Sequence, residues 1–429
     1  MSKRIHNRIV AALALLCISF SIYAEDDTGA FTGYTPYSVF GLGDIYTMGS
    51  AYTSSMGGVG IASRNNRFIN PMNPAAVTAR DSLAFMVDFS LFGGSRFMSQ
   101  DTGVNNKSLN NTFNIGDCII SFPIYKSSAM MVGIMPYSST GYCYQYIEQD
   151  RSTIADVGNV GYSYNGKGGV YRIFAAAGVT FFKRLSLGAE ATYYFGNIVK
   201  SSSITFSDES YLGNKKTDRA NVNTFSGKFG IQYFQPVGER SSFGLGGTYR
   251  LGSRMKGIMN YSGEENNISG LRLSNEIGAG LSFHYHDNMK FEFDYINSDW
   301  RNSGFEKDEF FSVNGSSSPF VCTVAQSFRI GAEVVPDRRD ARYYMKRVAY
   351  RAGAYYNKEY YNVGGHDIKA MGVTLGATFP VFNGFNGLTV AVDFGQRGSL
   401  QNSLVRERYI NFSVAVNLYD RWFYKMQYE

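Results

Sequence analysis

Apolar and polar residues alternate strictly near the end of the chain. Across residues 410–418 every second residue is apolar, from Ile410 through Phe412 to Leu418, and the residues between them are small or polar. Because successive side chains of a β-strand point to opposite faces, this pattern predicts a strand with one apolar and one polar face. The pattern recurs along the chain, and short connections alternate with long polar loops. This asymmetry is typical of outer-membrane β-barrels.

We expect an all-β, membrane-spanning antiparallel β-barrel of about fourteen strands, an even number as in bacterial single-chain barrels. A soluble two-sheet sandwich would also explain the alternation, but segments of about ten residues fit the membrane barrel better. In one segment, Leu187 and Tyr193 fall on the face predicted to meet lipid, and Glu190 falls on the lumen face. The predicted strands begin near Ser82, Thr112, Ser128, Val170, Arg184, Ala220, Ser242, Leu271, Met289, Phe320, Met345, Lys369, Gly387 and Val405.

The composition agrees with a barrel and excludes other classes. Aromatic residues make up 16% of the chain, yet the mean hydropathy is only -0.20, because barrels carry their apolar residues on alternate positions. After residue 24, no stretch approaches the roughly 18 consecutive apolar residues that a membrane helix needs. The formal charge of +6 is scattered along the chain, so nucleic-acid binding has no support.

Residues 1–24 have the features of a secretory signal peptide. Lys3, Arg4 and Arg8 precede an apolar run that extends to Ile22, and acidic residues follow Ala24. The predicted organisation is a signal peptide (1–24), an N-terminal hatch or plug in the lumen (25–80), a transmembrane barrel (81–418) and an aromatic C-terminal tail (419–429). The predicted location is the outer membrane of a Gram-negative cell.

No group of residues has the spacing of a catalytic or metal site. After the signal peptide, the histidines are His284, His286 and His366, and there is no Gly-x-Ser-x-Gly elbow, HExxH motif or phosphate loop. The remaining cysteines are widely spaced and lack metal-binding partners. We therefore expect no enzymatic activity, no cofactor and no metal.

A glycine-rich segment precedes the first predicted strand, and it carries the residues of a resemblance. Residues 41–44 read Gly-Leu-Gly-Asp, residues 55–62 read Ser-Met-Gly-Gly-Val-Gly-Ile-Ala, and residues 70–75 read Asn-Pro-Met-Asn-Pro-Ala. The segment resembles the FadL family of outer-membrane transporters for long-chain fatty acids and other hydrophobic compounds. In that family a small-residue stretch and an Asn-Pro-Ala signature form a hatch inside a fourteen-stranded barrel.

The resemblance implies a hatch here as well, although an ordinary periplasmic extension outside the barrel stays open. Tyr37, Ser38 and residues 41–44 also resemble relatives from Bacteroidota that include PorV-like proteins of type IX secretion. The hatch residues that the resemblance implies are Gly57, Gly58, Gly60, Asn70, Pro71, Asn73, Pro74 and Ala75.

The third predicted strand contains Gly133 and Pro136, and neither suits a regular central strand, so a kink or gap is expected there. The resemblance implies that such a kink opens a lateral path from the lumen to the outer leaflet; alternatively, Pro136 simply ends the strand. Arg329, Glu333 and Arg351 are predicted to face the lumen on adjacent strands. They would either hold the hatch or bind a ligand carboxylate, and structural pairing is expected because buried charges need partners.

Taken together, these features favour a passive conduit for hydrophobic, fatty-acid-like molecules, with hatch rearrangement and lateral exit. The alternative is a non-transporting barrel of the same fold that serves as an accessory subunit in protein secretion or outer-membrane assembly. The expected partners are outer-membrane lipid, a hydrophobic small molecule, and other outer-membrane or secretion proteins. Residues 336–346 form a longer, basic connection that is either a docking surface or a solvated loop.

Overall fold

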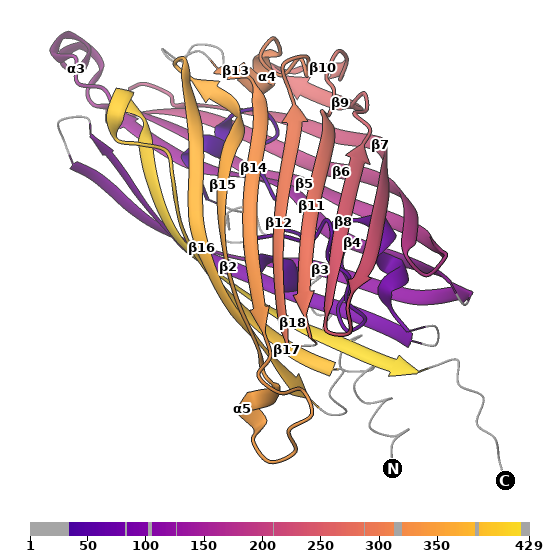
Figure 1. Ribbon diagram of the computed structural model, residues 1–429. Coiled ribbons are helices and arrows are strands. Elements are labelled where there is room, and N and C mark those ends of the chain that lie inside the picture. The colour runs from indigo at the N-terminus through magenta and orange to yellow at the C-terminus, as the bar shows by residue number, and fades with distance from the viewer. Residues whose placement is uncertain are drawn as a thin grey trace, which may run out of the picture. The chain divides into compact units, whose positions relative to one another are not determined.

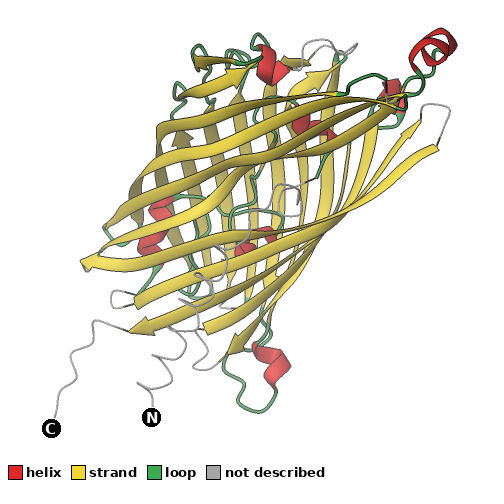
Figure 2. Cartoon of the chain, turned by 180° about the vertical axis from the view of Figure 1, so that it is seen from behind, coloured by secondary structure: helices red, strands yellow, loops and turns green. Residues whose placement is uncertain are grey.

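The strands of this chain join into one antiparallel sheet that closes on itself (Figures 1 and 2). The chain divides into two units, Met1–Phe31 and Thr32–Glu429, and the barrel belongs to the second. The predicted signal peptide and the tail beyond Arg421 lie outside the described residues and stay predictions. No helix among the described residues has the length and apolar character needed to cross a membrane. The computed structural model describes residues 34–81, 84–101, 105–125, 127–208, 210–286, 288–312, 320–381 and 386–421.

The wall contains fourteen strands, as the alternation predicts. Three short strands continue or flank them at one end: β9 (Lys256–Tyr261), β10 (Glu264–Asn267) and β13 (Phe320–Cys322). The wall strands are β2 (Ala84–Asp101), β3 (Asn105–Tyr125), β4 (Ser128–Ile147), β5 (Val160–Phe181), β6 (Leu185–Phe206), β7 (Asn214–Val237), β8 (Ser241–Arg250), β11 (Asn275–Tyr285), β12 (Met289–Asp299), β14 (Val324–Val334), β15 (Ala349–Val363), β16 (His366–Val381), β17 (Asn386–Arg397) and β18 (Val405–Arg421).

Two pairings close the barrel. The last strand, β18, pairs with the first wall strand, β2, from Val405↔Gln100 to Arg421↔Ala84. In the middle of the chain, β8 pairs directly with β11, and the short strands β9 and β10 lie in the connection between them. Because every wall strand lies between two others, most backbone donors and acceptors in the apolar zone find partners without water, and the exception lies between β3 and β4.

Several strands begin earlier than the alternation predicted. β3, β5 and β7 start at Asn105, Val160 and Asn214, well before the predicted Thr112, Val170 and Ala220. The extensions of β3 and β7 are mostly polar, so the hydrophobic period weakens there although the backbone ladder continues. β18 also runs to Arg421, three residues beyond the predicted end of the barrel at residue 418.

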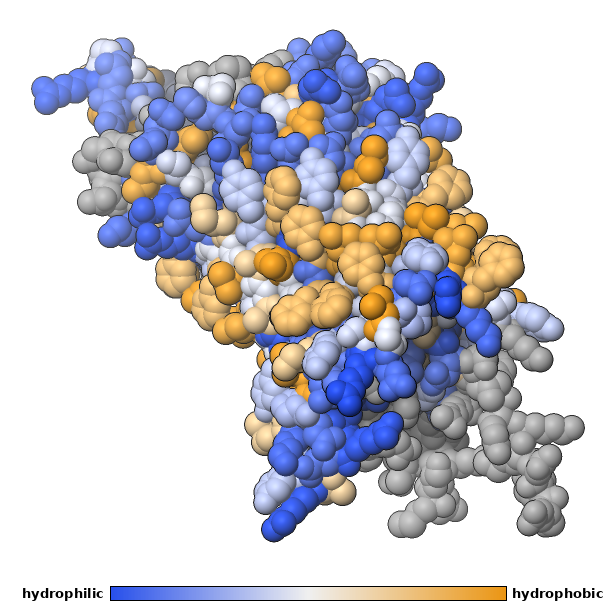
Figure 3. All heavy atoms as spheres, viewed as in Figure 1, coloured by the Kyte–Doolittle hydropathy of each residue, from blue (hydrophilic) through white to orange (hydrophobic). Residues whose placement is uncertain are grey.

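The predicted separation of faces is confirmed. In β6, Leu187, Ala189 and Ala191 are exposed on the outside, whereas Glu190 and Thr192 are buried on the inside. Apolar side chains gather in a band across the middle of the wall, between polar zones at the two ends (Figure 3). An apolar band flanked by polar zones is the surface that a bilayer requires.

The connections differ between the two ends of the barrel. At the short-turn end, β5–β6, β7–β8 and β11–β12 are joined by three residues or fewer, and one longer connection carries α5 (Tyr344–Arg347). At the long-loop end lie α3 (Arg151–Val157), α4 (Glu309–Ser312) and η4 (Gln401–Ser403). Two connections at that end are also short, since three residues separate β2 from β3, and Gly364 and Gly365 alone join β15 to β16. Outer-membrane barrels place their short turns in the periplasm.

Residues 34–81, which we call the inner segment, precede the wall. They contain η2 (Pro36–Val39), β1 (Asp44–Ile45), α2 (Ala51–Ser54) and η3 (Pro74–Ala79). Pro36 and Pro74 each start a 3-10 helix, where a missing N–H costs nothing, and Thr35 and Asn73 cap these helices through their side chains. The segment is short of regular structure, so its conformation depends on contacts with the wall.

A pair of prolines in β18 tests the closure. Val414 and Val416 have ladder partners on both sides, in β17 and in β2. We expect Val414→Pro with Val416→Pro to abolish heat-modifiable gel migration, because each leaves ladder groups unpaired in lipid at roughly 1–3 kcal/mol. The matched control is Val414→Ile with Val416→Ile. A proline variant that still migrates as a folded barrel would contradict the assignment of β18.

Candidate functional site

Inward-facing glycines of the wall let the inner segment approach closely. A Cβ at Gly353 would lie 2.2 Å from the carbonyl carbon of Met56, and one at Gly331 would lie 2.4 Å from the Met56 oxygen. Gly331 and Gly353 are direct partners in the ladder, as are Gly246 and Gly280. The wall glycines whose added Cβ would meet the inner segment within 3 Å include Gly178, Gly188, Gly230, Gly246, Gly280, Gly331, Gly353 and Gly376.

Charged side chains of the wall bind the backbone of the glycine-rich stretch. The Asp294 carboxylate accepts hydrogen bonds from the N–H groups of Gly60 (2.6 Å) and Ile61 (2.9 Å). Arg329, which is 1% exposed, donates to the carbonyl oxygens of Thr47 (2.8 Å) and Gly58 (2.9 Å). Hydrogen bonds to charged groups each contribute about 1.5–3 kcal/mol. Opposite charges of the wall therefore hold one turn of the inner segment.

The Asn-Pro-Met-Asn-Pro-Ala stretch is held in a similar way. Asn73 accepts from Ala75 N–H (3.0 Å) and donates to the carbonyl oxygen of Ile61 (2.8 Å). Asn70 donates to the carbonyl oxygen of Gly60 (2.6 Å), and Lys228 of the wall donates to that of Met72 (2.6 Å). The two asparagines thus tie both halves of the inner segment together.

The structure brings these predicted hatch residues into one region against the wall. Gly57 and Gly58 have φ angles of 74° and 80°, which favour glycine, and Gly57 N–H donates to Thr374 Oγ1 (2.7 Å). Pro71 lines the cavity at the wall split that is described below, and Pro74 and Ala75 pack against Gly188. That this region acts as a hatch stays a prediction.

Strands β3 and β4 part halfway along their length. Their ladder runs from Tyr125↔Ser128 to Cys118↔Ile134 and goes no further among the described residues, although both strands continue. Each strand carries an irregularity at this level, since β3 shifts register against β2 before Cys118 and β4 shifts against β5 between Pro136 and Ser138. Such bulges bend a strand and end its pairing. The wall is therefore split above Ile134.

The two residues predicted for this region lie on different sides of the point of separation. Gly133 is within the regular ladder, paired with Ile119 on one side and Phe174 on the other. Pro136 lies beyond the last β3–β4 pair, next to the irregularity in β4. Whether either residue shapes a ligand path stays a prediction.

Residues 35–46 of the inner segment, which we call the arm, occupy the free edge of β4. Asp44 and Ile45 pair with Ser139 and Ser138 as a short antiparallel ladder. Tyr46 N–H donates to the carbonyl oxygen of Tyr137 (2.9 Å), and Thr35 N–H donates to that of Gly141 (2.8 Å). The arm thus supplies the backbone partners that β3 does not.

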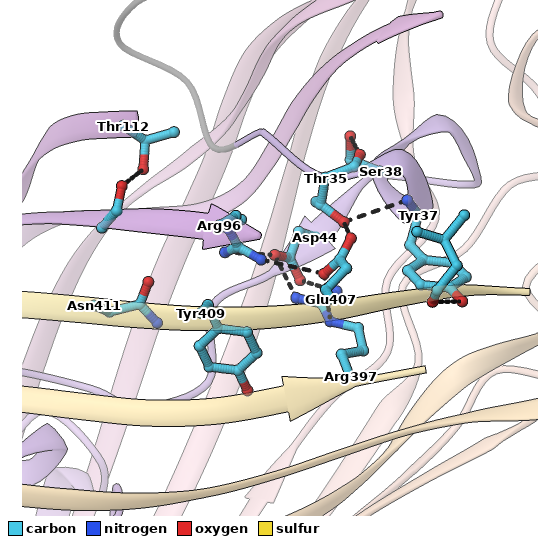
Figure 4. Close-up of polar contacts among 12 residues, drawn as sticks. Thr35, Tyr37, Ser38, Asp44, Arg96, Thr112, Arg397, Glu407, Tyr409 and Asn411 are labelled. Carbon is cyan, nitrogen blue, oxygen red and sulfur yellow. Dashed lines mark hydrogen bonds and ion pairs between the residues drawn. The ribbon is translucent and has the colours of Figure 1, made fainter. Parts of the chain in front are cut away.

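A charge cluster fixes the other side of the arm (Figure 4). Arg397 of β17 donates two hydrogen bonds to the Asp44 carboxylate, of 2.9 and 2.8 Å, and Arg96 of β2 lies 3.4 Å from the same carboxylate. Glu407 of β18 lies 3.5 Å from each arginine and accepts a hydrogen bond from Thr35. Bidentate arginine–carboxylate pairs combine strength with fixed geometry. The arm therefore bridges β4 to the strands on the far side of the split.

A cavity of about 290 Å³ lies between the inner segment and the wall, and it touches both edges of the split. Thr112 and Gly116 of β3 line it, and so do Met135 and Pro136 of β4. Its lining also contains many ionisable side chains: Asp44, Arg96, Arg172, Lys228, Arg250, Glu276, Arg329, Lys358, Glu359, Asp393 and Arg397. Several of these are paired, as Arg397 is with Asp44 and Arg250 with Glu276, and apolar side chains such as Phe92 and Phe412 line the cavity too. The volume is near the lower limit of small-molecule sites, about 300 Å³.

Aromatic side chains pack above the cavity at the long-loop end. Phe40 of the arm stacks on Phe320, with ring centroids 5.2 Å apart. Lys200 donates to the carbonyl oxygens of Val39 (2.9 Å) and Phe310 (2.6 Å), which joins the arm to the loop that carries α4. Trp300, Phe305, Phe310 and Phe311 are each at most 3% exposed in this cluster. The arm is therefore buried under the loops as well as against the wall.

The three predicted lumen charges do not form one site. Glu333 and Arg351 pair at 2.7 Å as neighbours in the ladder, whereas Arg329 binds the inner segment. The sequence did not predict Arg96, Arg397 and Glu407 as site residues, although Asp44 lies in the Gly-Leu-Gly-Asp stretch at residues 41–44. Their inward positions on β2, β17 and β18 were the available signal, but their meeting at Asp44 depends on barrel closure.

One glycine tests how closely the wall and the inner segment fit. We expect Gly353→Ala to lower the free energy of unfolding by about 1–3 kcal/mol, because its Cβ overlaps Met56. Gly227→Ala is the matched control, since its Cβ would meet no atom nearer than 3.5 Å, and its effect should stay within about 0.5 kcal/mol. Urea unfolding in lipid vesicles measures both. Equal effects would mean that the inner segment does not press on Gly353.

Solved structures share this architecture. The toluene transporter TbuX of Ralstonia pickettii matches with a TM-score of 0.54 and 15% identity, over 86% of this chain and 98% of that chain. The toluene transporter TodX of P. putida matches with a TM-score of 0.55 and 12% identity, over 89% and 100%. A FadL homologue of Pseudomonas aeruginosa matches with a TM-score of 0.50 and 11% identity, over 89% and 99%. At such low identity these likenesses show the fold alone.

The sequence itself gives a family. A search of curated proteins finds no match. The BamG family model matches residues 1–429, which is the whole length of the chain. The chain therefore belongs to the BamG family, and its fold is that of the FadL-type barrels.

Proposed function

We propose that this chain is a plugged outer-membrane barrel that serves as an accessory subunit in outer-membrane protein assembly. The observation that carries the proposal is the arm, which occupies the wall split with backbone bonds on the β4 side and the Asp44 cluster on the other. In this view the inner segment is a permanent hatch. A barrel whose break between β3 and β4 is sealed from within is suited to a structural role in the membrane.

Two further points support this role. The name of the family suggests partners in outer-membrane assembly, and the opening at Tyr37, Ser38 and residues 41–44 resembles PorV-like proteins from Bacteroidota. Ionisable groups of the cavity lining also pair with one another, as Arg250 does with Glu276 at 3.2 Å, and such an internal network suits a plug that stays in place. On this view, partners bind the outside of the barrel rather than its lumen.

The test is native mass spectrometry of the protein extracted from its own membrane in mild detergent. We expect a stoichiometric protein partner and no bound small hydrophobic molecule. Depletion of the chain should also lower the amounts of other outer-membrane β-barrel proteins, measured by quantitative proteomics. A barrel that comes out alone with a lipid-like ligand in its lumen would overturn the proposal.

A second candidate function is the passive conduit for hydrophobic molecules with lateral exit. The cavity favours it, since Thr112, Gly116, Met135 and Pro136 place it against both edges of the split. In a conduit, the arm would have to leave β4 in order to open the path. The difference between the two functions is therefore whether the arm must move.

A disulfide between the arm and β4 separates these two functions. Ile45 and Ser138 are direct partners in the ladder, so Ile45→Cys with Ser138→Cys would fix the arm to the wall. The accessory role predicts unchanged assembly of other barrels and unchanged uptake of a fluorescent fatty acid. Loss of uptake under oxidation, restored by reduction of the same variant, would establish the conduit instead.

A further inference from the structure

A second cavity, of about 360 Å³, lies at the short-turn end between the inner segment and the wall. Residues 64–67 of the inner segment form one side. Phe234, His284, Asn288 and Lys290, which lie on or next to β7, β11 and β12, form much of the other. This cavity is separate from the one at the wall split, and no residue lines both.

The lining of this cavity has more basic than acidic side chains. Arg64, Arg67, Lys290 and Arg338 line it, and Glu333 is its one acidic residue among the described residues. Lys290 pairs with Glu292 at 2.7 Å, so the arginines carry the excess positive charge. Glu333 is already neutralised, since Arg351 lies 2.7 Å and Arg338 lies 3.2 Å from its carboxylate. A concave surface with one sign of charge concentrates the field and attracts groups of the opposite sign.

Arg64 has no acidic partner within salt-bridge distance among the residues that the structure describes. Its guanidinium donates to neutral oxygens, those of Ser186 (2.6 Å), Gln232 (3.3 Å) and Thr78 (3.3 Å). A partly buried cation without a counter-charge is costly, and a carboxylate from outside would offset that cost. The cavity is therefore complementary to an anionic group.

A basic loop continues this surface away from the barrel. Residues 337–347 contain five cationic side chains, and α5 projects beyond the strand ends in both views (Figures 1 and 2). The two acids of the loop are used within it. Asp340 accepts from the N–H groups of Arg342 (2.7 Å) and Tyr343 (2.8 Å) and pairs with Lys346 at 3.0 Å, and Asp337 accepts from Arg339 N–H (2.9 Å). The loop is thus ordered by its own contacts, which lowers the entropy cost of binding.

The outward side of the loop combines charge with apolar surface. Tyr343 is 51% exposed and Met345 is 58% exposed, and Arg342 lies over the Tyr343 ring at 5.3 Å. Exposed aromatic, methionine and arginine side chains are the types that are enriched where proteins bind one another. The loop is also fixed to the cavity, because Val335 N–H donates to the carbonyl oxygen of Asn288 (2.8 Å).

We propose that the cavity and the loop together form a docking site for an acidic segment of a periplasmic protein. Carboxylates of the segment enter the cavity beside Arg64 and Arg338, and its neighbouring residues lie on Arg339, Arg342 and Tyr343. Arg64 belongs to the inner segment rather than to the outer face of the wall, so lipid headgroups around the barrel do not reach it. The site rests on the proposed function, which needs a partner, and it names the face and the chemistry of that partner.

Binding of a fluorescently labelled, glutamate-rich peptide to the full chain in neutral detergent tests the site. Two double variants each remove two positive charges: Arg64→Gln with Arg338→Gln in the cavity, and Arg339→Gln with Arg342→Gln on the exposed loop. The cavity pair should raise Kd by ~10-fold or more, because a lost charge-assisted hydrogen bond costs at least about that factor. The loop pair should raise Kd by at least about 3-fold, because exposed ion pairs are weaker. The second pair is solvent-exposed, so it leaves the barrel fold intact, as heat-modifiable migration would show.

The matched control is Lys183→Gln with Arg184→Gln, which removes the same charge from an exposed turn at the same end. We expect it to change Kd by less than about 2-fold. Equal weakening by all three double variants would reduce the effect to net charge and overturn the proposal. The proposal would also be overturned if the chain did not bind the peptide and instead bound phosphatidylglycerol vesicles in a way that depends on Arg342. If both site variants keep their native protein partner, the docking site is wrong while the accessory function stands.

Discussion

Every backbone donor and acceptor that lies in lipid must be paired, and this barrel breaks that rule at one place. β3 and β4 separate above Ile134, which leaves the edge of β4 without its neighbour. The arm restores the pairing from the lumen side, through Asp44 and Ile45. The inner segment therefore packs inside the wall and also completes its hydrogen bonding. Removing it would expose backbone groups of β4 at a depth where water is scarce.

The rest of the inner structure follows from the need to hold that arm. A short ladder of two residue pairs is weak alone, and the cluster of Asp44 with Arg96 and Arg397 adds contacts from strands on the opposite side of the split. Below it, wall glycines such as Gly353 admit the backbone of the inner segment, and Arg329 and Asp294 bind its turns. Shape and charge act together here, since a Cβ at the glycines would prevent the hydrogen bonds from forming.

Two features distinguish this barrel within the shared fold: the bonded arm at the wall split and the basic surface at the short-turn end. The wall of this FadL-type barrel is split between β3 and β4, yet the arm bonds to β4 within the split and a cluster of charged side chains holds it there. The basic surface lies instead at the short-turn end, beside Arg64 and the loop that carries α5. These two features, a bonded arm within and an excess of basic side chains at one end, are the basis of the proposal that the barrel holds a partner at the membrane.

The sequence by itself determined the class of fold. The period of two, the aromatic content and the lack of a long apolar run left a membrane barrel as the best solution, and the faces of β6 followed residue by residue. It also marked the region near Gly133 and Pro136, and the asparagines and glycines of the inner segment. Strand ends such as Asn105 were missed, since polar extensions of a ladder carry no hydrophobic period.

Only the tertiary structure decided what the inner charges do. Glu333 and Arg351 could be paired from neighbouring strands, but Arg329 turned instead to the inner segment. Asp44, Arg96, Arg397 and Glu407 are separated by up to several hundred residues, and they meet because the barrel closes between its first and last strands. Contacts across a closed ring leave no local pattern in a sequence, so the alternation predicted the wall and closure alone created the site.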